Sequence, residues 1–499
     1  MTLKDRIEAA RGDRPADLVL RGGNLVDVLS GEIYRADVAF FDGLVIGVGE
    51  GYDAVTEVDC TGKWIAPGFI DGHMHVESTM VTVSEFARVV LPRGTVATVF
   101  DPHEIGNVHG IDGIRYILES GRRVPLRTWV MVSSCVPATH METAGAELNA
   151  ATLALLFGEE GVLGLAEMMN FPGVVFGDPG VLEKLKAAKE KGVVIDGHSP
   201  GLVGKRLNAY IVGGPGSDHE CTTLEEAREK LRKGMRVMIR EASTAKNLEA
   251  LLPLVTPETE RRCCFVTDDR HPADLVSEGH IDHAVRKAIR LGLDPMTAYR
   301  MASINTAEWF RLDQRGFGAV APGWRADVIV LDDLENVSVK ETYIDGKLVA
   351  RNGQVVVDLP TAASPLPPSV HVDLEKFSGF GIPVEPGVIR VIDVIEGQIV
   401  TGQSRMDPSI ADGEAVADPD RDLAKFAVVE RHGKNGGVGL GFVRGFGLKH
   451  GAVASSVGHD SHNIAIAGMD DQSMRTALEE VIHLDGGLVV TSGTEVIAS

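Results

Sequence analysis

Cysteine is scarce in this chain: 499 residues contain only five, and no two of them form a Cys-x-x-Cys pair. An odd number without such pairs argues against a disulfide framework and against a zinc knuckle, and it is typical of reduced thiols. We therefore expect a cytoplasmic protein in which most cysteines are small buried side chains.

Basic residues are also few, because 49 lysines and arginines stand against 71 aspartates and glutamates, for a formal net charge of −22. Nucleic acids and anionic membranes are bound through basic patches, so neither is an expected partner. No apolar run approaches the length of a membrane span. The first residues, MTLKDRIEAARGDRP, lack the apolar core of a secretory signal.

What the chain does have is a long alternation of strand and helix patterns. Eight segments, each followed by a helical pattern, predict strands at 68–75, 95–101, 126–132, 162–167, 193–198, 217–220, 236–241 and 263–268. The sixth segment is the shortest, and we include it partly because a barrel of this kind requires eight strands. Eight such units predict an α/β fold with a TIM-like (β/α)₈ barrel.

The flanking segments predict the remaining domains. Short apolar stretches separated by Gly-rich turns occur at residues 1–66 and again at 320–359, around a barrel at 67–319. They predict one small β domain built from both flanks. A Pro-rich linker, TAASPLPPSV, follows Pro360 and leads to a separate C-terminal α+β domain at 370–499.

Two helices have clear boundary signals. In DPGVLEKLKAAKEKG, Asp178 is the predicted N-cap, Pro179 the first helical residue and Gly192 the residue that ends the helix. In TTLEEAREKLRKG, Thr222 and Glu225 have the spacing of a capping box.

His73 and His75 end the first barrel strand, in PGFIDGHMH, and they face the same side because alternate residues of a strand do so. Barrel active sites lie at the C-terminal strand ends. Four later strands end in further metal-ligand types: Glu167, His198, His219 and Asp268. The alternative is that these are ordinary polar strand ends, with Asp269 as the competing ligand beside Asp268.

As a set, these residues predict a two-metal site. Glu167 is the expected bridge, because one carboxylate can span two ions about 3.5–4 Å apart. His73, His75 and Asp268 would complete the shell of one ion, and His198 and His219 would hold the other. Mixed imidazole and carboxylate ligands leave Mn, Fe and Zn open.

The His-x-His motif and several longer runs resemble the amidohydrolase superfamily of metallo-dependent hydrolases and, within it, the adenine deaminases. These runs are DPHEIGNV (101–108), SSCVPAT (133–139), GLAEMMNFPGV (164–174), IDGHSPGL (195–202), SDHECTT (217–223), VMIREAS (237–243), FVTDDRHP (265–272) and the C-terminal VGLGFVRGFGLKHGAVASSVGHDSHNIAIAG. Ser199 and Gly106 stand where that family has alanine. Members of the family usually run on past VVTSGTEVIAS, so we expect an incomplete C-terminal domain of the adenine-deaminase type.

The resemblance implies hydrolysis of adenine to hypoxanthine and ammonia, a step of purine salvage and adenine catabolism, with two Mn²⁺ or Fe²⁺ ions per chain. In this hypothesis Asp268 accepts the proton of the attacking water, and Glu104, with Asp101, donates a proton to the ring. Possible contacts with the purine edge are Ser134, Arg240 and Glu241, which could equally support their neighbours. The family also implies a homodimer or higher homo-oligomer.

Two other functions remain open: a cyclic amidase or dipeptidase of the same superfamily, and a catalytically silent barrel used as a binding module. Dihydroorotases and hydantoinases bridge their metals with a carbamylated lysine on the fourth strand. Here that strand ends in Glu167, and the nearest lysine, Lys184, lies in the following helix, which favours a deaminase. The absence of a GxxxxGK[ST] phosphate loop favours a free base over a nucleotide.

Two features of the C-terminal region carry weaker signals. His459 and His462, in GHDSHN, stand three residues apart, a spacing that is common by chance, and we favour a structural role for them. Asp460 and its neighbours could instead close over the barrel mouth. The GGVGLGF run lacks the strand–turn–helix context of a nucleotide loop and predicts tight turns.

Overall fold

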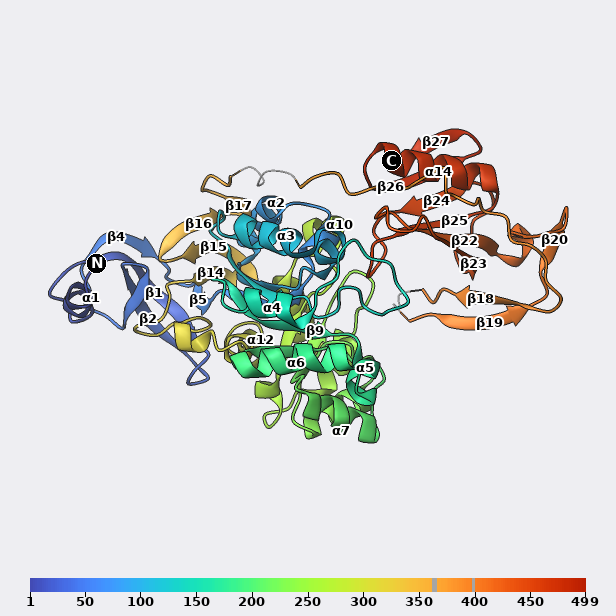
Figure 1. Ribbon diagram of the computed structural model, residues 1–499. Coiled ribbons are helices and arrows are strands. Elements are labelled where there is room, and N and C mark those ends of the chain that lie inside the picture. Colours follow the sequence, from blue (N-terminus) through green and yellow to red (C-terminus); the bar gives the residue numbers. More distant parts are fainter. Residues whose placement is uncertain (361–365, 397–399) are drawn as a thin grey trace. The chain divides into compact units, whose positions relative to one another are not determined.

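The computed structural model describes residues 1–360, 366–396 and 400–499, so the first five residues of the predicted linker lie outside it. The chain divides into two compact units (Figure 1). Unit 1 comprises Met1–Pro102, Arg115–Ser134 and Asn149–Ser364, and unit 2 comprises His103–Ile114, Cys135–Leu148 and Pro365–Ser499. Within the described residues, no helix is long and apolar enough to cross a bilayer, and all five cysteines are buried free thiols.

A nine-stranded sheet joins the two flanks of unit 1. Strand β5 (Trp64–Pro67) pairs antiparallel with β14 (Val328–Asp333), so the strands that precede and follow the central region share one sheet. The other strands are β1 (Ala16–Asp27), β2 (Glu32–Phe41), β3 (Leu44–Val48), β4 (Ala54–Asp59), β15 (Ser338–Ile344), β16 (Lys347–Arg351) and β17 (Gln354–Val355). The short helix α1 (Leu3–Ala10) precedes β1.

The centre of unit 1 contains eight parallel strands, each close to its predicted range. Five form one curled sheet: β6 (Phe69–Met74), β7 (Thr95–Phe100), β8 (Arg127–Val132), β9 (Val162–Met168) and β10 (Val194–Gly197). Three form a second sheet: β11 (Ser217–Asp218), β12 (Arg236–Arg240) and β13 (Cys263–Val266). A parallel bridge between Met74 and Asp268 connects β6 with the end of β13. The sixth strand is indeed the shortest.

Helices follow these strands, and those around the first five strands are visible in Figure 1. They are α2 (Val83–Val90), α3 (His103–Gly121), α4 (Ala150–Leu156), α5 (Phe171–Phe176), α6 (Pro179–Lys191), α7 (Gly204–Gly213), α8 (Leu224–Arg232), α9 (Leu248–Leu251), α10 (Pro272–Ser277), α11 (Ile281–Arg290), α12 (Pro295–Met301) and α13 (Ile304–Trp309). The path of α3 breaks at Gly110, which has a φ of 61°.

The predicted boundaries of α6 are confirmed, because Asp178 caps its start and Gly192, with a φ of 67°, ends it. The predicted capping box of α8 is wrong by one residue. Thr223, not Thr222, accepts the hydrogen bond from the Glu226 amide. Both threonines have the same chemistry, and only the backbone conformation at Thr223 decides between them.

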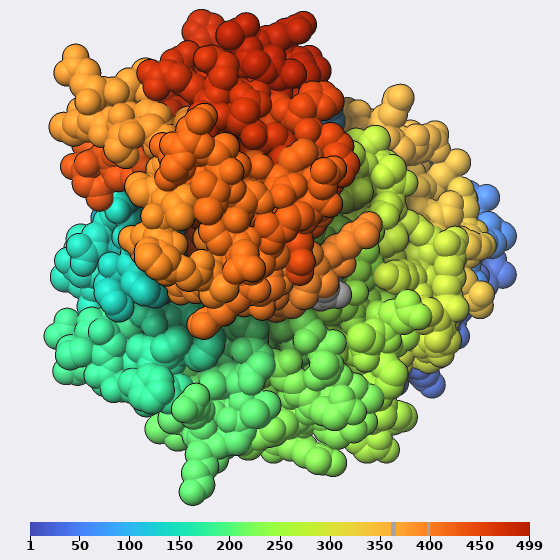
Figure 2. Space-filling model, turned by 90° about the vertical axis from the view of Figure 1, so that its right-hand side faces the viewer, coloured from blue at the N-terminus to red at the C-terminus, as the bar shows by residue number. Residues whose placement is uncertain are grey.

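Unit 2 contains an eight-stranded sheet, with its residues orange to red in Figure 2. The strands are β18 (Ile389–Asp393), β19 (Gly402–Met406), β22 (Leu423–Val429), β23 (Val438–Arg444), β24 (Ala452–Ser455), β25 (Ile464–Gly468), β26 (Leu488–Ser492) and β27 (Glu495–Ala498), beside a hairpin of β20 (Ser409–Ala411) and β21 (Glu414–Val416). Helix α14 (Asp471–His483) packs Met474, Leu478 and Val481 against the sheet. Most of GGVGLGF lies in β23, so the prediction of tight turns there is wrong.

A buried lysine organises the strand ends around β10 and β11. The Lys230 side chain is fully buried, and its Nζ donates to Asp218 Oδ2 at 2.5 Å, Glu226 Oε1 at 2.7 Å and the Ser199 carbonyl at 2.7 Å. Asp218 in turn accepts from the amides of Ser199 and Glu220. The lysine thereby fixes the segments that carry His198 and His219.

Replacing Lys230 with methionine should therefore destabilise the protein strongly. Removing one partner of a buried ion pair costs about 3–5 kcal/mol, because the remaining carboxylate stays buried without its counter-charge. Lys233→Met is the matched control, since Lys233 pairs with Glu229 at a more exposed position and such pairs contribute about 0–1 kcal/mol. Urea unfolding of both variants measures the difference, and equal loss of stability would contradict the assigned role.

Candidate metal centre

His73 and His75 extend from the end of β6, and both are 2% exposed. Their Nε2 atoms lie near one oxygen of Asp268: Oδ1 is 3.5 Å from His73 and 3.1 Å from His75. The Nδ1 of His75 lies 2.8 Å from the Asp101 carbonyl oxygen, so Nδ1 carries the proton and Nε2 presents its lone pair toward Glu167 and Asp268. The same-side placement that the strand pattern predicted is what brings these groups together.

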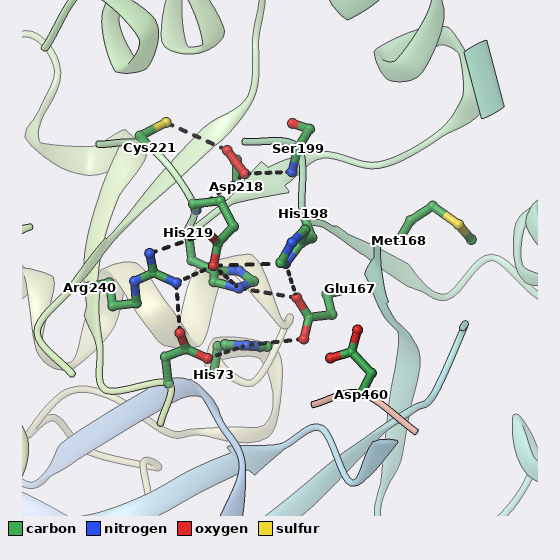
Figure 3. A network of polar contacts seen from close by, with 12 residues as sticks. His73, Glu167, Met168, His198, Ser199, Asp218, His219, Cys221, Arg240 and Asp460 are labelled. Atoms are coloured by element: carbon green, nitrogen blue, oxygen red, sulfur yellow. Dashed lines mark hydrogen bonds and ion pairs between the residues drawn. The ribbon is translucent and has the colours of Figure 1, made fainter. Parts of the chain in front are cut away.

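Glu167, near the end of β9, lies close to four imidazoles, and Figure 3 shows it beside three of them, His73, His198 and His219. Its Oε1 is 3.8 Å from His73 Nε2 and 3.4 Å from His75 Nε2. Its Oε2 is 2.5 Å from His198 Nδ1 and 3.2 Å from His219 Nε2. Each carboxylate oxygen thus faces a different pair, which is the arrangement that a bridging ligand requires.

These distances fit shared cations. Two ligand atoms bound at about 2.0–2.2 Å to one ion are separated by roughly 3.0–3.5 Å, and most of the separations around Glu167 and Asp268 fall near that range. His73, His75 and Asp268 form one potential ligand group, and His73, Glu167 and His219 form another. All of these side chains are buried.

The electrostatics of the pocket are those of a cation site. Burial opposes a charge on His198, but the nearby carboxylates of Glu167 and Glu220 outweigh it and raise the pKa of His198 to about 9. Burial also opposes a charge on Asp268, but Arg240 outweighs it and holds the pKa of Asp268 well below its usual range. The carboxylate of Asp268 is therefore ionised at neutral pH, and the pocket attracts positive charge.

Arg240 contacts the candidate ligand Asp268 and the neighbouring Glu220. It is 1% exposed, its guanidinium forms an ion pair with Glu220, and it donates to Asp268 Oδ2 at 2.7 Å. Glu220 Oε1 also lies 3.5 Å from His219 Nε2 and 3.8 Å from His198 Nδ1. Arg240 therefore sets the orientation of Asp268, with Oδ1 left toward His73 and His75.

The other two residues singled out for the purine edge also have partners in the structure. Ser134 Oγ donates to the Glu167 carbonyl at 2.5 Å, on the strand that carries the bridging carboxylate. Glu241 Oε1 accepts from Lys287 at 2.6 Å, and burial raises the pKa of Glu241 less than the hydrogen bonds with His283 and Lys287 lower it. Both contacts hold the strand ends in place.

Asp101 and Glu104 belong to different units. Asp101, 1% exposed, follows β7 in unit 1, and its amide donates to the Met74 carbonyl at 3.0 Å. Glu104, 3% exposed, is the second residue of α3 and belongs to unit 2. There it lies 3.5 Å from His103 Nε2 and 3.3 Å from His459 Nδ1.

Sequence reasoning gave no role to Glu220 or Lys230. Lys230 had a detectable signal, because it shares a face of α8 with Ala227, and that face is buried. A lysine on the apolar face of an amphipathic helix indicates a buried ion pair. Glu220 directly follows His219, and only the fold shows that its carboxylate turns toward Arg240.

Comparison with known proteins identifies the family. The amidohydrolase family matches residues 64–349, and the adenine deaminase C-terminal domain matches residues 398–499. The adenine deaminase of Desulfatibacillum aliphaticivorans is 48% identical over 496 residues, which cover 99% of this chain and 86% of that protein. The adenine deaminase of Oleidesulfovibrio alaskensis is 47% identical, with 100% and 86% covered.

Solved structures share the fold at low sequence identity. A variant of atrazine chlorohydrolase from Arthrobacter aurescens, complexed with zinc and atraton, is 14% identical, with a TM-score of 0.52 and 68% of this chain and 97% of that chain covered. The β-aspartyl dipeptidase of Fervidobacterium islandicum is 16% identical, with a TM-score of 0.51 and 68% and 98% covered. These similarities concern the fold alone, whereas the full-length relatives decide the family. The chain belongs to the adenine deaminase family of the amidohydrolases.

Proposed function

We propose that this protein hydrolyses adenine to hypoxanthine and ammonia at the centre around Glu167. The observation that carries the proposal is the position of the Glu167 carboxylate, with one oxygen toward His73 and His75 and the other toward His198 and His219. The names of the full-length relatives supply the substrate, since those proteins are adenine deaminases. The reaction consumes one water and releases one ammonia for each adenine.

We also propose that the two parallel sheets, β6–β10 and β11–β13, close into one (β/α)₈ barrel. This proposal is supported by the parallel pairing of β6 to β10 and of β11 to β13, in chain order. The Gly216 amide donates to the Ile195 carbonyl at 3.0 Å, and the Asp268 amide donates to the His73 carbonyl at 3.0 Å. These bonds lie at the two places where the sheets meet, and closure there would gather all predicted ligands at one end.

The residues present fit two divalent ions, for which we propose Mn²⁺ or Fe²⁺. His73, His75 and Asp268 would hold one, His198 and His219 the other, and Glu167 would bridge them. Bound ions of this kind lower the pKa of a water toward neutrality, which supplies the nucleophile. In a cyclic amidase a carbamylated lysine would bridge the metals, and Lys184 is the lysine nearest to β9 in the sequence. Its Nζ instead donates to the Ser134 carbonyl at 2.8 Å, which supports the deaminase over a cyclic amidase.

Asp268 is the proposed proton acceptor. Its Oδ2 is held by Arg240, so Oδ1 is the atom available to take the proton of the attacking water and deliver it to the exocyclic nitrogen, which leaves as ammonia. The low pKa of Asp268 keeps it ionised before the water is deprotonated. Arg240 acts through Asp268 in this scheme, because its donors already face two carboxylates.

Glu104, in the first turn of α3, is the proposed proton donor to a ring nitrogen, and Asp101 stands between β7 and that helix in the sequence. A ring that gains a proton does not accumulate negative charge when water adds to the amine-bearing carbon. Asp101 contributes through its carbonyl, which fixes the tautomer and direction of His75. Loops after barrel strands are the segments from which such enzymes draw catalytic groups.

Glu167→Gln should release metal and abolish most activity. An amide is neutral, so it cannot balance the charge of two cations. Even the loss of a residue that only contacts a metal ligand lowers metal affinity or activity by about 10–100-fold. We expect ammonia release from adenine to fall more than about 100-fold, with fewer ions per chain by elemental analysis. Glu190→Gln, at an exposed position of α6, is the control. Unchanged metal content in Glu167→Gln would contradict the bridging role.

Glu104→Gln tests the proton donor separately from the metal. Loss of general acid catalysis should lower kcat by about 10²–10⁴-fold, while elemental analysis gives the wild-type number of ions. The control is Glu119→Gln, at the exposed end of the same helix. If turnover stays at the wild-type level, Glu104 has no part in the reaction.

A substrate comparison separates the remaining alternatives. Equal concentrations of adenine and hydantoin are incubated with the metal-loaded protein, and ammonia and ring-opened product are both measured. The proposal expects ammonia from adenine and no opening of hydantoin. The reverse result would indicate the cyclic amidase. Metal binding without turnover of either compound would indicate a binding module.

A further inference from the structure

A second group of histidines and carboxylates lies within unit 2, at the start of α3 and in the loop Gly458–Asn463. Ligand atoms of His103, His459 and Asp460 lie within 4.8 Å of one another, and so do those of Glu104, His459 and His462. The two triads share His459. Sequence spacing alone favoured a structural role for this loop, because the contribution of α3 is not visible from the loop sequence.

Three separations within the group are longer than typical hydrogen bonds and suit ligands of one ion. His103 Nε2 lies 3.5 Å from Asp460 Oδ1 and 3.5 Å from Glu104 Oε1, and His459 Nδ1 lies 3.3 Å from the same Glu104 oxygen. Hydrogen bonds from nitrogen to oxygen measure about 2.7–3.2 Å, whereas two ligands of one ion stand roughly 3.0–3.5 Å apart. The spacing resembles that around Glu167.

The loop that carries these groups is fixed by its own contacts. The Asn463 side chain donates to the Thr143 carbonyl at 2.9 Å, and Ser461 Oγ donates to Glu142 at 2.5 Å. The buried Arg431 donates to the His462 carbonyl at 3.3 Å. A site built on a fixed backbone loses little conformational entropy when it binds an ion.

His462 gives a second, independent observation. Its side chain is 6% exposed, and its Nε2 has no hydrogen-bond partner among the residues that the structure describes. A buried imidazole nitrogen without a partner costs free energy unless something occupies the space next to it. One of its ring nitrogens also lies within 4.8 Å of ligand atoms of Glu104 and His459.

We propose that unit 2 binds a divalent cation of its own, held by His103, His459 and Asp460. Two imidazoles and one carboxylate suit Zn²⁺, Fe²⁺ or Mn²⁺ and leave positions open for His462 or water. The ion ties the loop Gly458–Asn463 to the first turn of α3. Because Glu104 follows His103, the ion connects this C-terminal loop with the segment that bears the proposed proton donor.

Zinc stoichiometry tests this site without reference to adenine. Wild type, His459→Gln, Asp460→Asn and the exposed control His483→Gln are stripped of metal, equilibrated with Zn²⁺ by dialysis and measured by elemental analysis. We expect one fewer Zn²⁺ per chain in the first two variants than in wild type and control. Circular dichroism and melting curves confirm that the variants fold.

A rescue variant makes the test sharper. His459→Cys replaces the imidazole by a thiolate, which is a strong zinc ligand, and should restore the missing ion where His459→Gln does not. Equal zinc content in wild type, His459→Gln and Asp460→Asn would overturn the proposal. The result is separable from the centre in unit 1, because Glu167→Gln lowers metal content there whether or not the second site exists.

Discussion

The Glu167 carboxylate is the group on which the centre depends. It lies in the barrel region at 3% exposure, with two imidazoles near each oxygen. Three buried imidazoles, the partly exposed His198 and two carboxylates from five strand ends would be costly to gather without cations to bind. The Glu167 carboxylate lies near all four imidazoles, and together with Asp268 these groups fit a divalent metal centre.

Around that group, buried ion pairs hold the ligands rather than contact a substrate. Arg240 connects Glu220 with Asp268, and Lys230 connects Asp218 with Ser199. The positively charged side chains of Arg240 and Lys230 are each buried together with carboxylates, which balance their charge. Outer-shell contacts of this kind restrict the rotamers of the ligands, and the geometry of a metal site depends on that restriction.

The C-terminal unit adds a second concentration of the same residue types. Its loop Gly458–Asn463 is anchored by Arg431 and Asn463 and brings His459 and Asp460 to the residue before Glu104. A cation there would connect a segment of the amidohydrolase region with the domain that distinguishes adenine deaminases.

The sequence by itself determined the order of strands and helices, the same-side placement of His73 and His75, and the family, because periodicity, turn residues and local motifs are properties of neighbours in the chain. The tertiary structure decided which side chains contact one another. Arg240, a candidate for the purine edge, turns to Glu220 and Asp268; Lys230 lies in a buried ion network; and His459 meets Glu104 across hundreds of residues. The physical reason is that side-chain contacts depend on how strand ends and loops converge in space, which no local pattern encodes.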